Sequence, residues 1–181
     1  MLKSLFVSID KVKIYEDFIV IESYPFEPSV AYKQTIFKAF EIENVDINYT
    51  PSTIKVENDL IFIPAFLREE LKTFAQNNKI SIIKRELIWD FILEPFLDTE
   101  FSEEQKEKTF KYLNGFGLDK NAVQSLRDEV SSQMYKYNFD TMLWEWINLS
   151  LFDVLSAMRA KYDKKDFKEF YQKAIRLALL K

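Results

Sequence analysis

The residues with the most capacity for chemistry lie in the segment 144–159. At about 100° per residue on a helix, one sector gathers its polar side chains, which are Glu145, Asn148, Asp153, Ser156 and Arg159. Trp144 and Trp146 flank that sector on either side. Such a groove, walled by indole rings, suits a cationic or planar ligand. Glu145 and Asp153 would then be paired carboxylates, one acid and one base, as in a carboxylate-based hydrolase.

A structural explanation fits the same segment, and we favour it. An amphipathic helix with a solvated polar stripe and aromatic shoulders has this spacing, and Arg159 would pair with a neighbouring carboxylate. The chain carries 29 acidic residues, so the presence of two carboxylates on one helix is weak evidence for a catalytic pair. We therefore keep Trp144, Glu145, Trp146 and Asp153 as candidate ligand- or partner-binding residues and assign no catalytic residue.

A second acidic stretch precedes a predicted helix. Asp98, Glu100 and Ser102 have the alternating spacing that opens a calcium-binding EF-hand loop. The sixth position is Glu103, where that loop needs Gly, and the twelfth is Thr109, where it needs Glu. The pattern instead indicates acidic residues placed in a first helical turn, where the helix dipole favours them.

The third candidate is an acidic hairpin tip, Glu16-Asp17, with Lys11 and Lys13 nearby. Residues 1–80 hold nine Lys and Arg against twelve Asp and Glu. A surface for anionic lipid would need basic residues at such a rim. The charge balance therefore argues against lipid and leaves a protein or peptide as the expected partner, although an ordinary charged turn also explains the tip.

The composition excludes several classes of chemistry. The chain has no His and no Cys, and its two glycines are Gly115 and Gly117. Imidazole catalysis, thiolate chemistry, disulfides and a glycine-rich phosphate loop are therefore absent. No Gly-x-Ser-x-Gly nucleophile motif occurs either. We predict no cofactor and no structural metal, while oxygen-only sites for calcium or magnesium stay open.

Charge and hydropathy narrow the partners and the compartment. The net charge is −4 with no basic stripe, so we expect no nucleic acid partner. No stretch reaches the roughly 18 apolar residues that span a bilayer, so we expect no membrane insertion. The N-terminus lacks the pattern of a signal peptide, and we expect a cytoplasmic protein. Richness in Lys, Ile, Asn and Phe is typical of an AT-rich bacterial genome.

The hydrophobic period changes near residue 80. Before it, short β-favouring runs alternate with turn residues, and hairpins are predicted around Glu16-Asp17 and around 57–59. A helix over 65–77 follows, with Leu67, Leu71, Phe74 and Ala75 on one face. The predicted strands are 12–15, 18–21, 35–40, 45–49, 54–56 and 60–63.

From about residue 85 the period is helical. Pro95 ends a first helix, Ser102 and Gln105 form a capping box, and Gly115 is the expected left-handed residue after the second helix. Asp119 caps a third, whose apolar stripe is Val123, Leu126, Val130, Met134 and Tyr137. One long helix is predicted over 139–162 and a last one from about Asp166, so that five helices form a bundle.

These elements predict an α+β protein. Residues 1–80 form an antiparallel β domain, a bent sheet or barrel capped by its C-terminal helix, and residues 81–181 form an all-helical domain packed against it. The order of strands followed by one helix, over about residues 5–78, resembles small bacterial domains of the pleckstrin-homology type. That resemblance rests on element order alone and implies a strongly bent sheet with one end plugged by the helix.

The functional expectation follows from what is absent and what is abundant. Aromatic residues make up 16% of the chain, and such side chains anchor protein interfaces. We expect a non-enzymatic protein-binding or regulatory module of bacterial origin, with homo-oligomerisation open. The alternative is a hydrolase that uses Glu145 and Asp153 in a Trp-lined pocket.

The composition yields a direct prediction about metals. Because thiolate and imidazole ligands are absent, the purified untagged protein should carry no tightly bound transition metal. Elemental analysis of the protein after dialysis measures this. A stoichiometric zinc, copper or iron content would contradict it.

Overall fold

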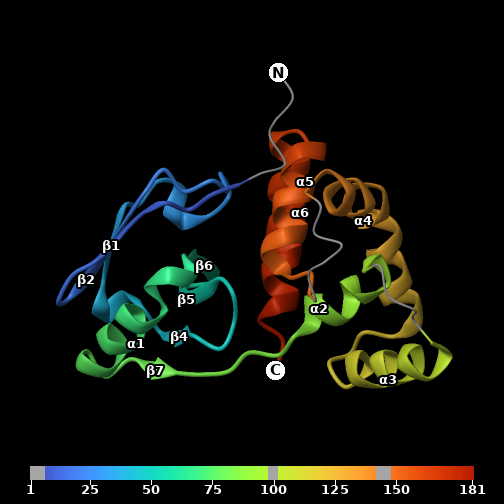
Figure 1. Cartoon of the computed structure of the whole chain (residues 1–181), viewed down its shortest axis with the longest axis horizontal. Helices are drawn as coiled ribbons and strands as arrows, with labels where there is room; N and C mark the ends of the chain where they lie inside the picture. The colour runs from blue at the N-terminus through green and yellow to red at the C-terminus, as the bar shows by residue number, and fades with distance from the viewer. Residues whose placement is uncertain (1–6, 98–101, 142–147) are drawn as a thin grey trace. The chain divides into compact units, whose positions relative to one another are not determined.

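The computed structural model describes residues 7–97, 102–141 and 148–181, with the side chains of 138–141 left out. The chain divides into two compact units, Val7–Arg85 and the part from Glu86 to Lys181 (Figure 1). The first holds the strands and the second is helical, so the predicted α+β class is confirmed. Trp144, Glu145 and Trp146 lie outside the described residues.

A three-stranded antiparallel sheet opens the first unit. Its strand order is β1-β2-β3, with Val12 opposite Ile21 and Ile19 opposite Phe37. The hairpin predicted around Glu16-Asp17 is confirmed, and β1 is an edge strand. The strands are β1 (Lys11–Ile14), β2 (Phe18–Glu22) and β3 (Ile36–Lys38).

A four-stranded sheet follows, in the order β6-β5-β4-β7. The predicted β5–β6 hairpin is confirmed, and Glu57 takes the positive φ of 53° in its turn. The two-residue strand β7 is new: it pairs in parallel with β4, and Asp46 at the end of β4 accepts from the backbone N–H of Arg85 at 2.7 Å. The strands are β4 (Asn44–Asp46), β5 (Ser52–Val56), β6 (Asp59–Ile63) and β7 (Ser81–Ile82).

The strands of the first unit thus form two open sheets in the described residues, where the sequence predicted one bent sheet or barrel. The strand predicted over 35–40 is cut short at Lys38 by a 3₁₀ turn, Ala39–Glu41. The Glu41 carboxylate accepts from the Lys38 N–H at 2.7 Å, which holds that turn. A closed barrel of the pleckstrin-homology type is not confirmed, and that resemblance stays a prediction.

The helix α1 (Arg68–Asn77) covers apolar residues of the first unit. Leu67, Leu71, Phe74 and Ala75 are all buried, as their shared face predicted. A 3₁₀ turn, Ala65–Leu67, leads into the helix, and another, Val30–Tyr32, follows Ser29. Buried Asp59 ties that second turn to β6, because its carboxylate accepts from Ser29 Oγ at 2.6 Å.

The described part of the second unit contains five α-helices, as predicted. Helix α2 contacts α3, α4 and α6, and the indole N–H of buried Trp89 on α2 donates to the carbonyl of Ala174 on α6 at 2.9 Å. Pro95 lies in a 3₁₀ turn, Glu94–Phe96, that ends α2. The helices are α2 (Ile88–Leu93), α3 (Glu103–Asn114), α4 (Lys120–Thr141), α5 (Leu151–Lys161) and α6 (Lys164–Ala178).

Most of the predicted helix ends are confirmed. Ser102 and Gln105 form the capping box of α3, and Asp119 Oδ1 accepts from the Ala122 N–H at the start of α4. The expectation for Gly115 is wrong, because it is right-handed with φ −58°. Gly117 has the positive φ of 79° instead, since the chain makes a further turn before it reverses.

The prediction of one helix over 139–162 is also wrong. Ser150 is extended, with φ −129° and ψ 177°, and α5 begins at the next residue. Ser150 and Asp153 form a capping box there, with the Ser150 N–H donating to Asp153 at 2.8 Å. The Ser150 and Asp153 capping box that starts α5 was therefore present in the sequence, but the continuous helical period of apolar residues around it favoured a single helix. Met142 and Leu143, which belong to the predicted helix, lie outside the described residues.

Among the described residues, none of the helices combines the length and the apolar character that crossing a bilayer requires. The longest, α4, carries charged residues along its length, among them Arg127, Asp128 and Glu129.

Leu149 provides a test of the hydrophobic core of the second unit. It directly precedes the capping box that starts α5, and its side chain is 3% exposed. Leu149→Ala should lower the free energy of unfolding by about 2–5 kcal/mol, because it removes buried methyl groups and leaves a cavity. Urea denaturation of the full chain measures the loss. A change below about 0.5 kcal/mol would place that face in solvent or at a partner surface.

Candidate functional site

Four candidate residues were placed on the predicted helix over 139–162, and of these Asp153 alone lies within the described part of the chain. It lies in the first turn of α5, and its carboxylate is held by protein groups on both oxygens. Ser150 Oγ donates to Oδ2 at 2.7 Å, and Tyr137 Oη donates to Oδ1 at 3.1 Å. Burial raises the pKa of Asp153, while these hydrogen bonds partly offset the shift. Helix capping at Ser150 and one hydrogen bond from Tyr137 of α4 therefore account for the contacts of this carboxylate.

The polar stripe expected beside Asp153 is solvated at Asn148, but its members on α5 are buried or partly buried. Ser156 is fully buried, and its Oγ donates back to the carbonyl of Phe152 at 2.7 Å. Arg159 is partly buried, and burial lowers its pKa. The residues described on α5 therefore do not form the exposed groove that the sequence indicated.

A second carboxylate, Asp90 on α2, was missed by the sequence analysis. Its Oδ1 atom is buried and has no hydrogen-bond partner among the described residues. Burial, and then the negative charge of Asp153, raise the pKa of Asp90 to about 7. Nothing in the sequence marks it, because a single Asp between Trp89 and Phe91 is ordinary for an amphipathic helix. Burial, with no hydrogen-bond partner at Oδ1 among the described residues, is the larger cause of this raised pKa, and the charge of Asp153 adds to it.

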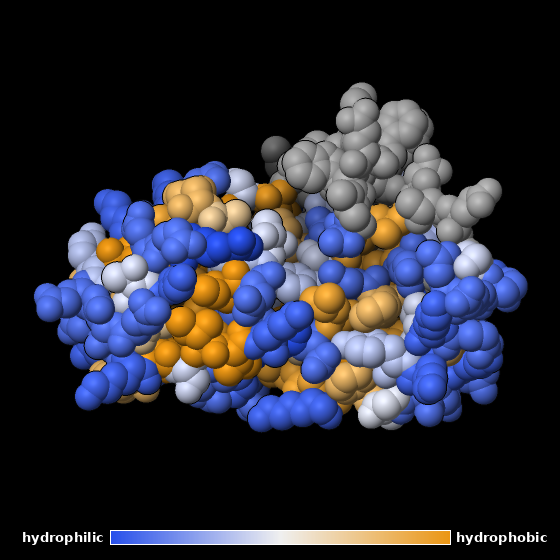
Figure 2. Space-filling model, turned by 60° about the horizontal axis from the view of Figure 1, so that its bottom comes forward, coloured by the Kyte–Doolittle hydropathy of each residue, from blue (hydrophilic) through white to orange (hydrophobic). Residues whose placement is uncertain are grey.

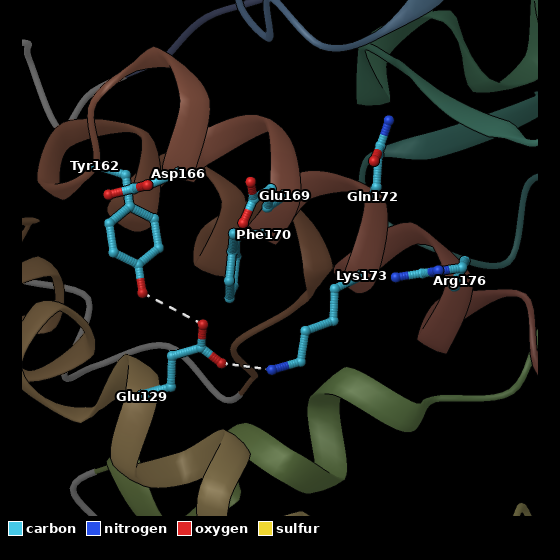
Figure 3. Close-up of a pocket in the computed structure, with 8 residues that line it drawn as sticks. All are labelled: Glu129, Tyr162, Asp166, Glu169, Phe170, Gln172, Lys173 and Arg176. Atoms are coloured by element: carbon cyan, nitrogen blue, oxygen red, sulfur yellow. Dashed lines mark hydrogen bonds and ion pairs between the residues drawn. The ribbon is translucent and has the colours of Figure 1, made fainter.

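A hollow of about 550 Å³ lies along α6 (Figure 3). Glu129 of α4 lies across it, and its carboxylate accepts from Tyr162 Oη at 3.3 Å and pairs with Lys173 Nζ at 2.7 Å. Burial and the charge of Glu129 raise the pKa of Tyr162 to about 12. The hollow is lined by Glu129, Tyr162, Asp166, Glu169, Phe170, Gln172, Lys173 and Arg176.

The helix dipole and contacts within the protein, rather than a ligand, explain the charged residues of this hollow. Asp166 lies in the first turn of α6 and Arg176 in its last, which is the arrangement that the helix dipole favours. Glu129 already has a cation and a hydroxyl as partners. We therefore assign no ligand to the hollow.

A groove of about 350 Å³ lies in the first unit, between the β1–β2 hairpin and α1. The hairpin contributes Ile14, Tyr15 and Glu16. Successive turns of one face of α1 contribute Glu69, Glu70, Thr73, Phe74 and Asn77. The groove thus joins residues that are more than fifty positions apart in the sequence.

The hairpin tip is held in place by backbone contacts. The side-chain amide of Asn78 donates to the carbonyls of Glu16 at 2.8 Å and of Phe74 at 2.9 Å. On the other side of the tip, the Ala39 N–H donates to the carbonyl of Asp17 at 2.8 Å. Tyr15 stacks on Phe18 with 4.6 Å between ring centroids. The hairpin wall of the groove is therefore joined by hydrogen bonds to Asn78 on one side and to Ala39 on the other.

The groove is acidic at its rim and apolar at its floor. Three of its eight lining residues are glutamates, and none is Lys or Arg. In the described part of the chain no ion pair involves Glu16, Glu69 or Glu70. Phe74 at the floor is 3% exposed. Across the described ranges, no group of three acidic residues is placed to hold a metal ion.

Comparison with known proteins adds no family. No protein-family model, no curated protein and no solved structure matches this chain. The candidate groove is therefore argued from its geometry alone.

Asp90 predicts a pH dependence of stability. Its pKa is about 7 in the folded state, above the ordinary 3.8, so the folded state binds more protons between these values. The stability from this group is complete below pH 4 and is lost as the pH rises through 7. Asp90→Asn should remove that loss and be more stable than the wild type at pH 8 by about 1–3 kcal/mol.

Urea unfolding at pH 5 and pH 8 measures this effect. The exposed Asp10→Asn variant serves as the control and should follow the wild type at both values. An Asp90→Asn variant that loses as much stability as the wild type between pH 5 and pH 8 would refute the assignment.

Proposed function

We propose that this chain is a non-enzymatic binding module that recognises another protein through its first unit, Val7–Arg85. The observation that carries the proposal is where large hydrophobic side chains are exposed. Of seven such residues in the described part of the chain, six belong to this unit, and Tyr135 is the exception. The six are Tyr15, Tyr32, Ile36, Phe40, Phe66 and Ile82.

Two of these side chains are far too exposed to serve a core. Phe40 is 84% exposed and Phe66 is 73% exposed. Figure 2 shows that hydrophobic residues reach the surface in patches bordered by hydrophilic ones. Aromatic side chains are enriched in protein interfaces, where a few anchoring residues carry most of the binding energy.

The hydrolase alternative has less support. It needs Asp153 as an available acid or base, yet both oxygens of that carboxylate accept hydrogen bonds at the start of α5. Its proposed partner, Glu145, lies outside the described residues. Neither the hollow along α6 nor the groove beside α1 is lined by Asp90 or Asp153.

Affinity capture tests the proposal with the full chain as bait, in lysate of the cells that encode it. Phe40→Ser/Phe66→Ser should recover at least about tenfold less partner than the wild type, because truncating an interface aromatic costs on the order of 2 kcal/mol. Tyr135→Ser, an exposed aromatic of the second unit, is the matched control and should recover the wild-type amount. Recovery of no specific partner by the wild type would overturn the proposal.

A further inference from the structure

We infer that the groove between the β1–β2 hairpin and α1 binds a short basic segment of the partner, in which Lys or Arg residues flank one apolar side chain. This inference rests on the proposed function, because it names the part of the partner that the module would recognise. It commits to one occupant on the basis of charge complementarity and of the apolar floor.

The floor of the groove supplies a place for the apolar side chain. Ile14 and Tyr15 form one wall, and Phe74 lies at the bottom. Stacking on Phe18 fixes the ring of Tyr15, which is 46% exposed and so offers its free face. The volume of about 350 Å³ is at the lower end for a binding pocket, and it suits one anchoring side chain of an extended segment.

The rim supplies the charge. Glu69 and Glu70 are exposed in the first turn of α1, where the helix dipole stabilises them, and Glu16 faces them from the hairpin. The lining residues include three glutamates and no cation, so the groove carries negative charge. A ligand that carries positive charge complements it. Its association would also be accelerated by the field of the rim and weakened by salt.

The two lysines of β1 lie away from this rim. On β1 the side chains alternate between faces, so Lys11 and Lys13 lie opposite to Val12 and Ile14. Ile14 lines the groove, and neither lysine does. A polyanion would be repelled by the same three carboxylates, and the described residues offer no triad of acidic ligands for a metal ion. A basic peptide is the occupant that remains.

The test uses the full chain and synthetic peptides. One panel of fluorescein-labelled twelve-residue peptides carries four Lys or Arg around a single Phe or Leu, and a second panel has Glu at the four basic positions. Fluorescence anisotropy measures binding to the wild type, to Glu16→Gln/Glu69→Gln/Glu70→Gln, and to a matched control, Asp10→Asn/Glu22→Gln/Glu57→Gln. The control neutralises three exposed carboxylates of the same unit outside the groove.

The expected result distinguishes binding in the groove from nonspecific attraction to the net negative charge of the protein. Basic peptides should bind the wild type and the control within about twofold of each other, and the groove variant at least about tenfold more weakly. This factor corresponds to two charged contacts of modest strength. Backbone amide shifts in NMR spectra of the wild type should change around Tyr15 and along α1. Thermal melts of all three proteins verify that each is folded.

Three results would overturn the inference: equal binding of the basic and acidic panels, equal weakening in both triple variants, or amide shifts confined to other surfaces. The captured partner distinguishes this inference from the proposed function. If that partner binds the groove variant as tightly as the wild type, the groove is wrong and the binding module stands. If no partner is captured, the module proposal fails and the peptide titration still decides the groove.

Discussion

The side-chain amide of Asn78 is the contact on which the candidate site depends. Its Nδ2 atom donates to two carbonyls, that of Phe74 in the last turns of α1 and that of Glu16 at the hairpin tip, which is 62 positions away in sequence. A turn between two strands is ordinarily one of the more mobile parts of a fold. Here the amide joins the turn to a helix end, so that the hairpin tip and α1 line one groove.

The carboxylates of the two units lie in different environments. The three glutamates of the groove in the first unit are exposed and have no cation beside them among its lining residues, which costs little free energy in water and leaves them available for recognition. On α5, Asp153 accepts hydrogen bonds from Ser150 and Tyr137, and partial burial of Asp90, followed by the charge of Asp153, raises the pKa of Asp90. A pair of this kind lowers stability as the pH rises. Its raised pKa values alone do not indicate catalysis, because structural contacts account for them.

Local signals decided which elements the sequence could predict. The two hairpins, the face of α1 and the capping box at Ser102 each depend on residues within a few positions, and all are confirmed. The break before α5 had the same kind of signal at Ser150 and Asp153, but a continuous apolar period outweighed it. The division into two sheets and the strand β7 depend on pairing between distant segments, so no local pattern indicates them.

The groove likewise depends on contacts between distant segments, which local sequence patterns do not indicate. The sequence marked the acidic tip at Glu16 and Asp17 and led us to expect a protein or peptide partner there, but the tip alone was also an ordinary turn. Only the packing of α1 beside β1 adds Glu69, Glu70 and Phe74 to it. Charge that is scattered over 55 residues of sequence becomes one rim with one floor. It is this combination, rather than the number of acidic residues, that gives a basic segment a reason to bind at one place on an already acidic chain.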